Sequence, residues 1–162
     1  MLSTYQYQKF EYHPPRELGA DKAVRHPVVI VGAGPVGLAA AIDLAQQNVP
    51  VLLLDDDDTV SVGSRGVCYA KRALEVLDRL GVADPCVDKG VSWNVGRTFF
   101  RSEEVYSFNL LPQPDHHRPG MINLQQYYLE EFLVKRARSL PSLDLRFRNK
   151  VVSMRAQDDA VA

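Results

Sequence analysis

The sequence predicts an α/β fold in which a parallel sheet is combined with an antiparallel hairpin. Residues 28–55 contain two apolar runs separated by a glycine-rich turn and an alanine-rich helix, which is the pattern of a βαβ unit. Residues 91–111 alternate apolar and polar side chains with a period of two, which is typical of a hairpin with one covered face. Amphipathic stretches at residues 71–80 and 125–139 predict two further helices.

Residues 1–26 predict an N-terminal extension that precedes a domain at residues 27–162. The extension is aromatic and then charged, with Tyr5, Tyr7, Phe10 and Tyr12 followed by Pro14 and Pro15. This composition fits two alternatives, a disordered leader or an extended arm laid across the domain.

The first apolar run leads directly into Gly32-Ala33-Gly34-Pro35-Val36-Gly37. In a Rossmann-like turn the first glycine makes the tight bend, the second lets a pyrophosphate approach the backbone, and the third lets the helix pack closely. A proline suits the first helical turn, whose N–H groups favour an anion. Asp55 ends the second apolar run, where a carboxylate can accept hydrogen bonds from a ribose. The stretch therefore predicts an adenine dinucleotide site.

Two groups of possible metal ligands are better explained as solvated loops. The aspartates at residues 55–58 are consecutive at a strand end, and such side chains cannot converge on one ion. His116 and His117 are adjacent in a loop, and adjacent histidines point in different directions. We therefore predict no metal site.

The segment Ser64–Ala70 leads into the helix predicted at residues 71–80, which Gly81 is suited to end. Arg65 lies in this segment and is open to two interpretations, a surface arginine or a group with a function. From the residues alone, we leave both interpretations open.

The later helix, at residues 125–139, carries a possible cap at its start. Asn123 and Gln126 have the N-cap and N3 spacing of a capping box, so one role of Gln126 would be to cap this helix. Alternation at residues 143–147 and an extended pattern at residues 151–154 predict further strands.

The composition is ordinary for a globular chain. The 162 residues are 46% hydrophobic and 24% charged, with a net charge of −1, so we expect a full core and neither nucleic-acid nor membrane binding. No apolar run has transmembrane length. Cys68 and Cys86 form no disulfide framework or metal spacing. We therefore predict a cytoplasmic protein.

Together these motifs resemble the N-terminal part of the FAD-dependent aromatic-ring hydroxylases, the para-hydroxybenzoate hydroxylase superfamily. The closer likeness is to its phenol- and hydroxyphenylpropionate-hydroxylase branch. The resemblance covers roughly residues 27–160. The motifs that carry it are Gly32-Ala-Gly-Pro-Val-Gly-Leu38, Asp55, Ser64-Arg-Gly66 with the following Leu74-Glu-x-Leu-x-x-Leu-Gly81 helix, and Leu124-x-Gln126-x-x-Leu129-Glu130-x-x-Leu133.

The resemblance implies a role for each matching residue. Residues 32–37 would hold the FAD pyrophosphate, and Asp55 would bind the adenosine ribose, where family members usually have glutamate. Arg65 and Gln126 would contact the cofactor, and backbone atoms of Val151 would meet the adenine. No residue is assigned as a catalytic acid or base.

The resemblance also implies a flavoprotein monooxygenase that hydroxylates a small phenolic substrate with O2 and NAD(P)H, as a monomer or a homo-oligomer. The family's Asp-Gly and Gly-Asp segments and its substrate sheet have no match here, so we expect a truncated FAD-binding domain that is inactive alone. One alternative is an NAD-dependent dehydrogenase, which would lack the Arg65 and Gln126 contacts. A second is a non-catalytic module that binds FAD or another nucleotide.

Overall fold

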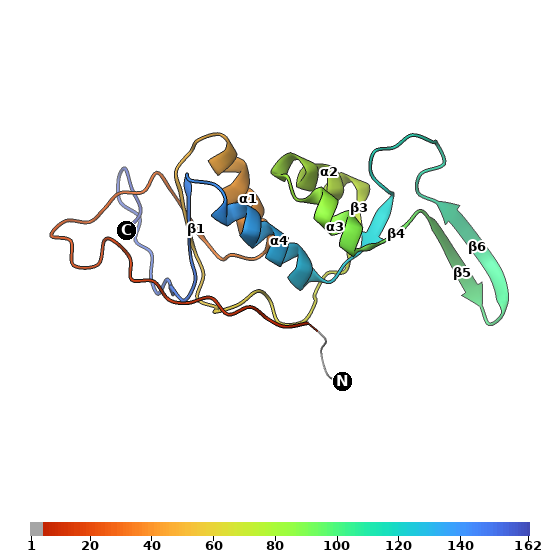
Figure 1. Ribbon diagram of the computed structural model, residues 1–162, viewed down its shortest axis with the longest axis horizontal. Helices are drawn as coiled ribbons and strands as arrows, with labels where there is room; N and C mark the ends of the chain where they lie inside the picture. Colours follow the sequence, from red (N-terminus) through yellow and green to blue (C-terminus); the bar gives the residue numbers. More distant parts are fainter. Residues whose placement is uncertain (1–4) are drawn as a thin grey trace. The chain divides into compact units, whose positions relative to one another are not determined.

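The computed structural model describes residues 5–162, which form two compact units (Figure 1). The first unit comprises the chain up to Val62 together with Leu133–Ala162, and the second comprises Gly63–Phe132. Both units combine helices with strands, so the predicted α/β fold class is confirmed. None of the helices in the described residues is both long and apolar enough to cross a membrane.

A three-stranded parallel sheet forms the centre of the first unit. Its strand order is β1-β2-β8. The strands are β1 (Val28–Val31), β2 (Val51–Leu54) and β8 (Leu143–Arg146). They begin in register, with Val28 opposite Val51 and Val51 opposite Leu143. Because side chains alternate along each strand, this register aligns apolar side chains across one face of the sheet.

Helix α1 (Pro35–Gln46) connects β1 to β2 and contacts all three strands of this sheet. Its small and branched apolar side chains allow a close approach to the strands. The buried ones are Leu38, Ala41, Ile42 and Ala45. Because a helix that joins two parallel neighbouring strands is a βαβ crossover, the prediction for residues 28–55 is confirmed.

Residues 5–26 form an extended arm on the first unit, red to orange in Figure 1. Phe10 of the arm is buried, and its ring stacks on the ring of Phe147 with 4.0 Å between the centroids. Further along the arm, Glu17 forms an ion pair with Arg146. Of the two alternatives for the N-terminal extension, the structure has the packed arm. The prediction for residues 1–4 lies outside the described residues.

The second unit contains a small antiparallel sheet, two helices and a hairpin. The sheet has the order β3-β7-β4. Its strands are β3 (Cys68–Ala70), β7 (Met121–Asn123) and β4 (Val91–Trp93). Helix α2 (Lys71–Leu80) has the predicted bounds and ends at Gly81, whose φ of 79° is a left-handed conformation. Strands β3 and β7 and helix α3 (Ala83–Lys89) were not predicted from the sequence.

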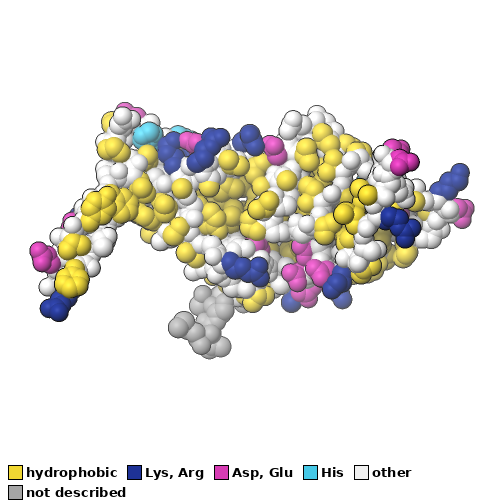
Figure 2. Space-filling model, turned by 180° about the vertical axis from the view of Figure 1, so that it is seen from behind, with side chains coloured by type: hydrophobic (Ala, Val, Ile, Leu, Met, Phe, Trp, Pro, Cys, Tyr) yellow, Lys and Arg dark blue, Asp and Glu magenta, His cyan; other side chains and the backbone are white. Residues whose placement is uncertain are grey.

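The hairpin predicted for residues 91–111 differs from the structure in two ways. Its strands are β5 (Val95–Phe100) and β6 (Glu103–Asn109), whereas residues 91–93 pair with β7 in the other sheet. Every residue of both strands except Gly96 is exposed, so the prediction of one covered face is wrong for the described chain. Figure 2 shows hydrophobic side chains along this hairpin. A period of two indicates a strand but not what covers it.

Two predictions near helix α4 (Gln126–Arg138) are also wrong. Asn123 is the last residue of β7 and not the N-cap of this helix. The next residue, Leu124, donates its N–H to the Val67 carbonyl at 2.8 Å, which continues the strand pairing. The strand predicted at residues 151–154 is absent from the described chain, where this segment is exposed and unpaired.

Candidate functional site

The turn between β1 and α1 depends on three glycines for three different reasons. Gly32 has a φ of 102°, a left-handed conformation that residues with a Cβ rarely adopt. A Cβ on Gly37 would lie 1.9 Å from the Gly32 carbonyl oxygen, so only glycine fits there. A Cβ on Gly34 would meet nothing within 4 Å. The space beside Gly34 is therefore open to a ligand that approaches the backbone.

Helix α1 begins at this turn and presents an anion-binding end. Gly34 is its N-cap and supplies no side-chain cap, and Pro35 occupies the first helical turn. The first N–H groups of a helix have no partner within it, and the helix dipole is positive at this end. Val36 is 84% exposed, so solvent reaches this end of the helix. These features fit a diphosphate beside Gly34.

The carboxylate of Asp55 lies against the glycine turn. Its Oδ2 accepts a hydrogen bond from the Ala33 N–H at 2.5 Å, and its Oδ1 accepts one from the Asp57 N–H at 2.8 Å. The Asp55 backbone is also held, because its N–H donates to the Arg146 carbonyl at 3.0 Å and its carbonyl accepts from the Asn149 N–H at 2.7 Å. A carboxylate oxygen accepts more than one hydrogen bond. Both oxygens therefore retain capacity for ribose hydroxyls.

A second group of predicted site residues lies in the second unit. The Gln126 side-chain Oε1 accepts a hydrogen bond from the Arg65 backbone N–H at 3.2 Å. The Gln126 backbone N–H donates to the Ser64 hydroxyl at 2.6 Å, and Gln126 Nε2 donates to the Glu130 carboxylate at 2.7 Å. Gln126 therefore joins the Ser64–Arg65 segment to the start of helix α4.

Arg65 and Glu130 have opposite environments in this group. Arg65 is exposed, and its guanidinium forms no hydrogen bond or ion pair with another residue of the described chain. Glu130 is only 1% exposed, and it was not among the site residues predicted from the sequence. The available signal was its i,i+4 spacing from Gln126, which places the two side chains together on one helix face. The geometry makes Gln126 and Glu130 a support for the Arg65 segment.

The predicted residues thus form two local groups. Residues 32–37 and Asp55 lie together in the first unit, and Arg65 and Gln126 lie together in the second. Val151 is 40% exposed and follows shortly after Asn149, which binds the Asp55 carbonyl. No group of three or more His, Cys, Asp or Glu residues within the described chain is arranged to hold a metal ion. The donors in the first group fit a dinucleotide cofactor.

Comparison with known proteins identifies the cofactor. A family model described as an FAD binding domain matches residues 25–162. The 6-hydroxy-3-succinoylpyridine 3-monooxygenase of Pseudomonas putida is 32% identical over 135 residues, which are 80% of this chain and 34% of that protein. The para-nitrophenol 4-monooxygenase of a Pseudomonas species is 30% identical over 140 residues, which are 82% of this chain and 33% of that protein.

A solved structure has a similar arrangement. The crystal structure of p-nitrophenol 4-monooxygenase from Pseudomonas putida DLL-E4 superimposes with a TM-score of 0.76 and 31% identity, over 84% of this chain and 35% of that one. The chain spans about a third of the length of the curated relatives cited above, at 34% and 33%. The resemblance to FAD-dependent aromatic hydroxylases is confirmed at the family level, and so is FAD as the cofactor. Because the family model matches residues 25–162, the chain belongs to the FAD-binding domain family.

Proposed function

We propose that this chain is the N-terminal, FAD-binding part of a flavin-dependent monooxygenase that hydroxylates a small phenolic compound. The names of two relatives support the substrate class, since para-nitrophenol and 6-hydroxy-3-succinoylpyridine are both aromatic rings with a hydroxyl group. The use of NAD(P)H and O2 and a cytoplasmic location are further parts of this proposal, and the oligomeric state stays open between a monomer and a homo-oligomer. Within it, residues 27–162 form the FAD-binding domain and residues 1–26 extend it.

The observation that carries the proposal is the open space beside Gly34, bordered by the start of helix α1 and the Asp55 carboxylate. In this site the backbone of residues 32–37 would bind the diphosphate, and Asp55 would orient the adenosine ribose. The adenine would lie near Val151. These groups bind and orient a cofactor, and none of them transfers a proton.

The second group would act at another part of the same cofactor. Gln126 holds the Arg65 backbone, and the exposed Arg65 guanidinium would supply a charge-assisted hydrogen bond to a phosphate or flavin oxygen. Bound FAD would supply the redox chemistry, by which NAD(P)H is oxidised, one oxygen atom of O2 is added to the ring and the other leaves as water.

Substitution of Gly34 tests this function. Gly34 has a φ of −74°, and a Cβ there meets no atom within 4 Å, so Gly34→Val in the intact enzyme is expected to fold normally and to lose FAD. A matched control is Gly37→Ala, which should lose both stability and FAD because its Cβ would meet the Gly32 carbonyl. The measurements are the flavin content of the purified protein and the melting temperature of its apo form. Full flavin content in a folded Gly34→Val enzyme would refute the proposed site.

Measurements on the intact wild-type enzyme distinguish the proposed function from its two alternatives. The match to the FAD binding domain model argues against the NAD-dependent dehydrogenase, which would bind NAD+ and not FAD in a titration of the apo protein. A non-catalytic module would bind FAD but show no phenol-dependent oxidation of NAD(P)H. We expect FAD binding together with that oxidation in the intact enzyme.

A further inference from the structure

The segment that follows Asp55 is held by residues of the N-terminal arm. We refer to residues 55–59 as the acidic loop. The Phe10 N–H donates to the Asp58 carbonyl at 2.7 Å, and the Thr59 hydroxyl donates to the Gln8 carbonyl at 2.8 Å. The Lys9 Nζ forms an ion pair with the Asp58 Oδ1 at 2.7 Å. Three consecutive arm residues therefore bind two consecutive residues of the acidic loop.

The same loop is bound by the segment that follows β8. The Arg148 N–H donates to the Asp57 carbonyl at 3.0 Å, and the Asn149 N–H donates to the Asp55 carbonyl at 2.7 Å. The arm and this second segment are joined by the stacked rings of Phe10 and Phe147.

Burial of Phe10 and Thr59 and a cation–π contact stabilise the packing of the arm against the acidic loop. Phe10 is 5% exposed and Thr59 is 8% exposed, so their contacts are shielded from water. The guanidinium of Arg138 lies over the Phe10 ring at 4.7 Å from its centroid, a cation–π contact. The arm is therefore an integral part of the packing around the acidic loop.

The conformation of the acidic loop sets the direction of the Asp55 carboxylate, because the Asp57 N–H is one of the two donors that hold it. We infer that residues 8–10 of the arm position the acidic loop, and through it Asp55, for the adenosine end of FAD. The inference rests on the proposed FAD site.

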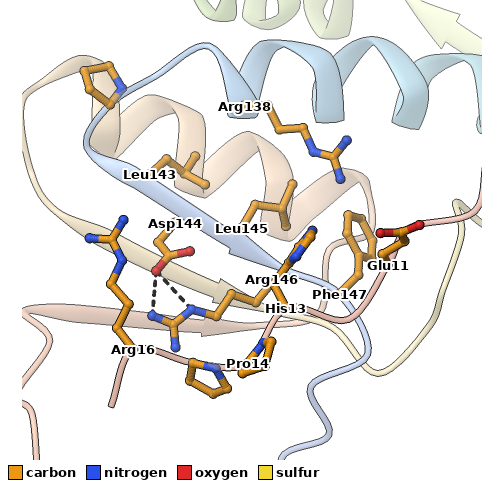
Figure 3. Close-up of a pocket in the computed structure, with 12 residues that line it drawn as sticks. Glu11, His13, Pro14, Arg16, Arg138, Leu143, Asp144, Leu145, Arg146 and Phe147 are labelled. Atoms are coloured by element: carbon orange, nitrogen blue, oxygen red, sulfur yellow. Dashed lines mark hydrogen bonds and ion pairs between the residues drawn. The ribbon is translucent and has the colours of Figure 1, made fainter. Parts of the chain in front are cut away.

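The middle of the arm offers a readout of this coupling. A cavity of about 420 Å³ lies between arm residues 11–16 and strand β8 (Figure 3). The Arg16 side chain is exposed at this cavity, and cleavage after Arg16 requires the arm backbone to detach and enter a protease active site. Because coupling between two sites is reciprocal in free energy, bound FAD should lower the population of the detached arm and so slow this cleavage.

The test uses Phe10→Ala in the intact enzyme. It removes the stack on Phe147, and we expect FAD affinity to fall about tenfold, the effect of losing roughly one well-made contact. The matched control is Arg25→Ala, which removes an arm contact to Asp159 that does not involve the acidic loop, and its FAD affinity should equal that of the wild type. Trypsin cleavage at Arg16 should be slowed by FAD in the wild type and in Arg25→Ala, but much less in Phe10→Ala.

A second variant keeps the test decisive if Phe10→Ala does not fold. Thr59→Val removes the hydroxyl that donates to Gln8 and leaves the Phe10 ring in place on Phe147, and FAD affinity should fall in this variant as well. Wild-type affinity in folded Phe10→Ala or Thr59→Val would overturn the role of the arm, and so would cleavage at Arg16 that FAD does not slow. A wild-type enzyme that binds no FAD would instead overturn the proposed function.

Discussion

At the residue scale, the candidate site depends on side chains that orient backbone segments. Asp55 accepts hydrogen bonds from the N–H groups of Ala33 and Asp57, which links the glycine turn to the acidic loop. Gln126 links the Arg65 backbone to helix α4 in the same way. The capping role predicted for Gln126 fails because helix α4 begins at Gln126 itself. Its side chain is instead engaged by Arg65 and Glu130.

Replacing Arg65 by alanine should weaken FAD binding with little effect on folding. The exposed guanidinium has no partner in the described chain, so its loss removes no internal contact. A charge-assisted hydrogen bond to FAD is worth about 1.5–3 kcal/mol, which corresponds to roughly a 10- to 100-fold change in Kd. The measurement is an FAD titration of apo enzyme together with its melting temperature. Arg72→Ala is the matched control, since Arg72 is an exposed helical arginine paired with Glu75. If Arg65→Ala and Arg72→Ala bind FAD equally well, Arg65 has no role in cofactor binding.

At the element scale, segments with a clear apolar pattern were predictable, including the four-residue strands β1 and β2, and the three-residue strands β3 and β7 were not. Helix α2 has its predicted bounds because a leucine stripe, and a glycine able to adopt positive φ, define it locally. Strands β3 and β7 have only three residues each, too few for a period to be recognised. The prediction that one face of the hairpin is covered was wrong for another reason. Whether a strand face is buried depends on which other element packs against it, and alternation along the strand does not reveal that element.

The arm should detach at low pH because protonation of Glu17 breaks its ion pair with Arg146. The Arg146 guanidinium donates two hydrogen bonds of 2.9 Å to Glu17 and lowers the pKa of Glu17 from 4.5 to about 2, with a smaller contribution from His26. Since the pKa is lower in the folded state, the stabilisation is complete above pH 4.5 and is lost as the pH falls towards 2. The protection factors of residues 11–26, which are corrected for the pH dependence of intrinsic exchange, should therefore fall across this range. In Glu17→Gln the protection factors should be lower and nearly independent of pH there; an unchanged pH dependence would exclude this ion pair as the cause.

At the scale of the whole molecule, apolar surface remains uncovered in both units. In the first unit, edge strand β1 exposes Val29 and Val31 at 49% and 63%. In the second, the hairpin exposes Phe99, Phe100 and Tyr106 at 55%, 64% and 61% (Figure 2). Uncovered strand edges and apolar patches favour association with other chains.

Residues 1–162 expressed alone should therefore be poorly soluble, bind FAD weakly and hydroxylate no phenol. The measurements are the size distribution of the purified chain, an FAD titration and NAD(P)H oxidation with a panel of phenols. As a control, Phe100→Lys combined with Tyr106→Lys should reduce association without restoring activity, because lysine blunts an exposed strand. Phenol-dependent NAD(P)H oxidation coupled to ring hydroxylation by this chain would contradict the prediction.

Features that depend on neighbouring residues were predictable from the amino-acid sequence. The turn at residues 32–37, the two strands beside it and the bounds of α2 follow from positive φ, close helix approach and apolar periodicity, which are local properties. The ordered motifs also indicated the family, and with it FAD.

Contacts between groups that are distant in the sequence became visible only in the folded chain. It places Phe10 on Phe147 and surrounds the buried Arg118 with Asp78 and Asp84, where it holds the pKa of Asp78 below its usual value. Sequence periodicity does not predict such pairs, because the two partners are distant in the sequence and come into contact only in the folded protein. Asp55 is an example. The sequence predicts an acid at the end of β2, but the contact of its carboxylate with the glycine turn depends on how the chain folds, because Ala33 and Asp55 are distant in the sequence.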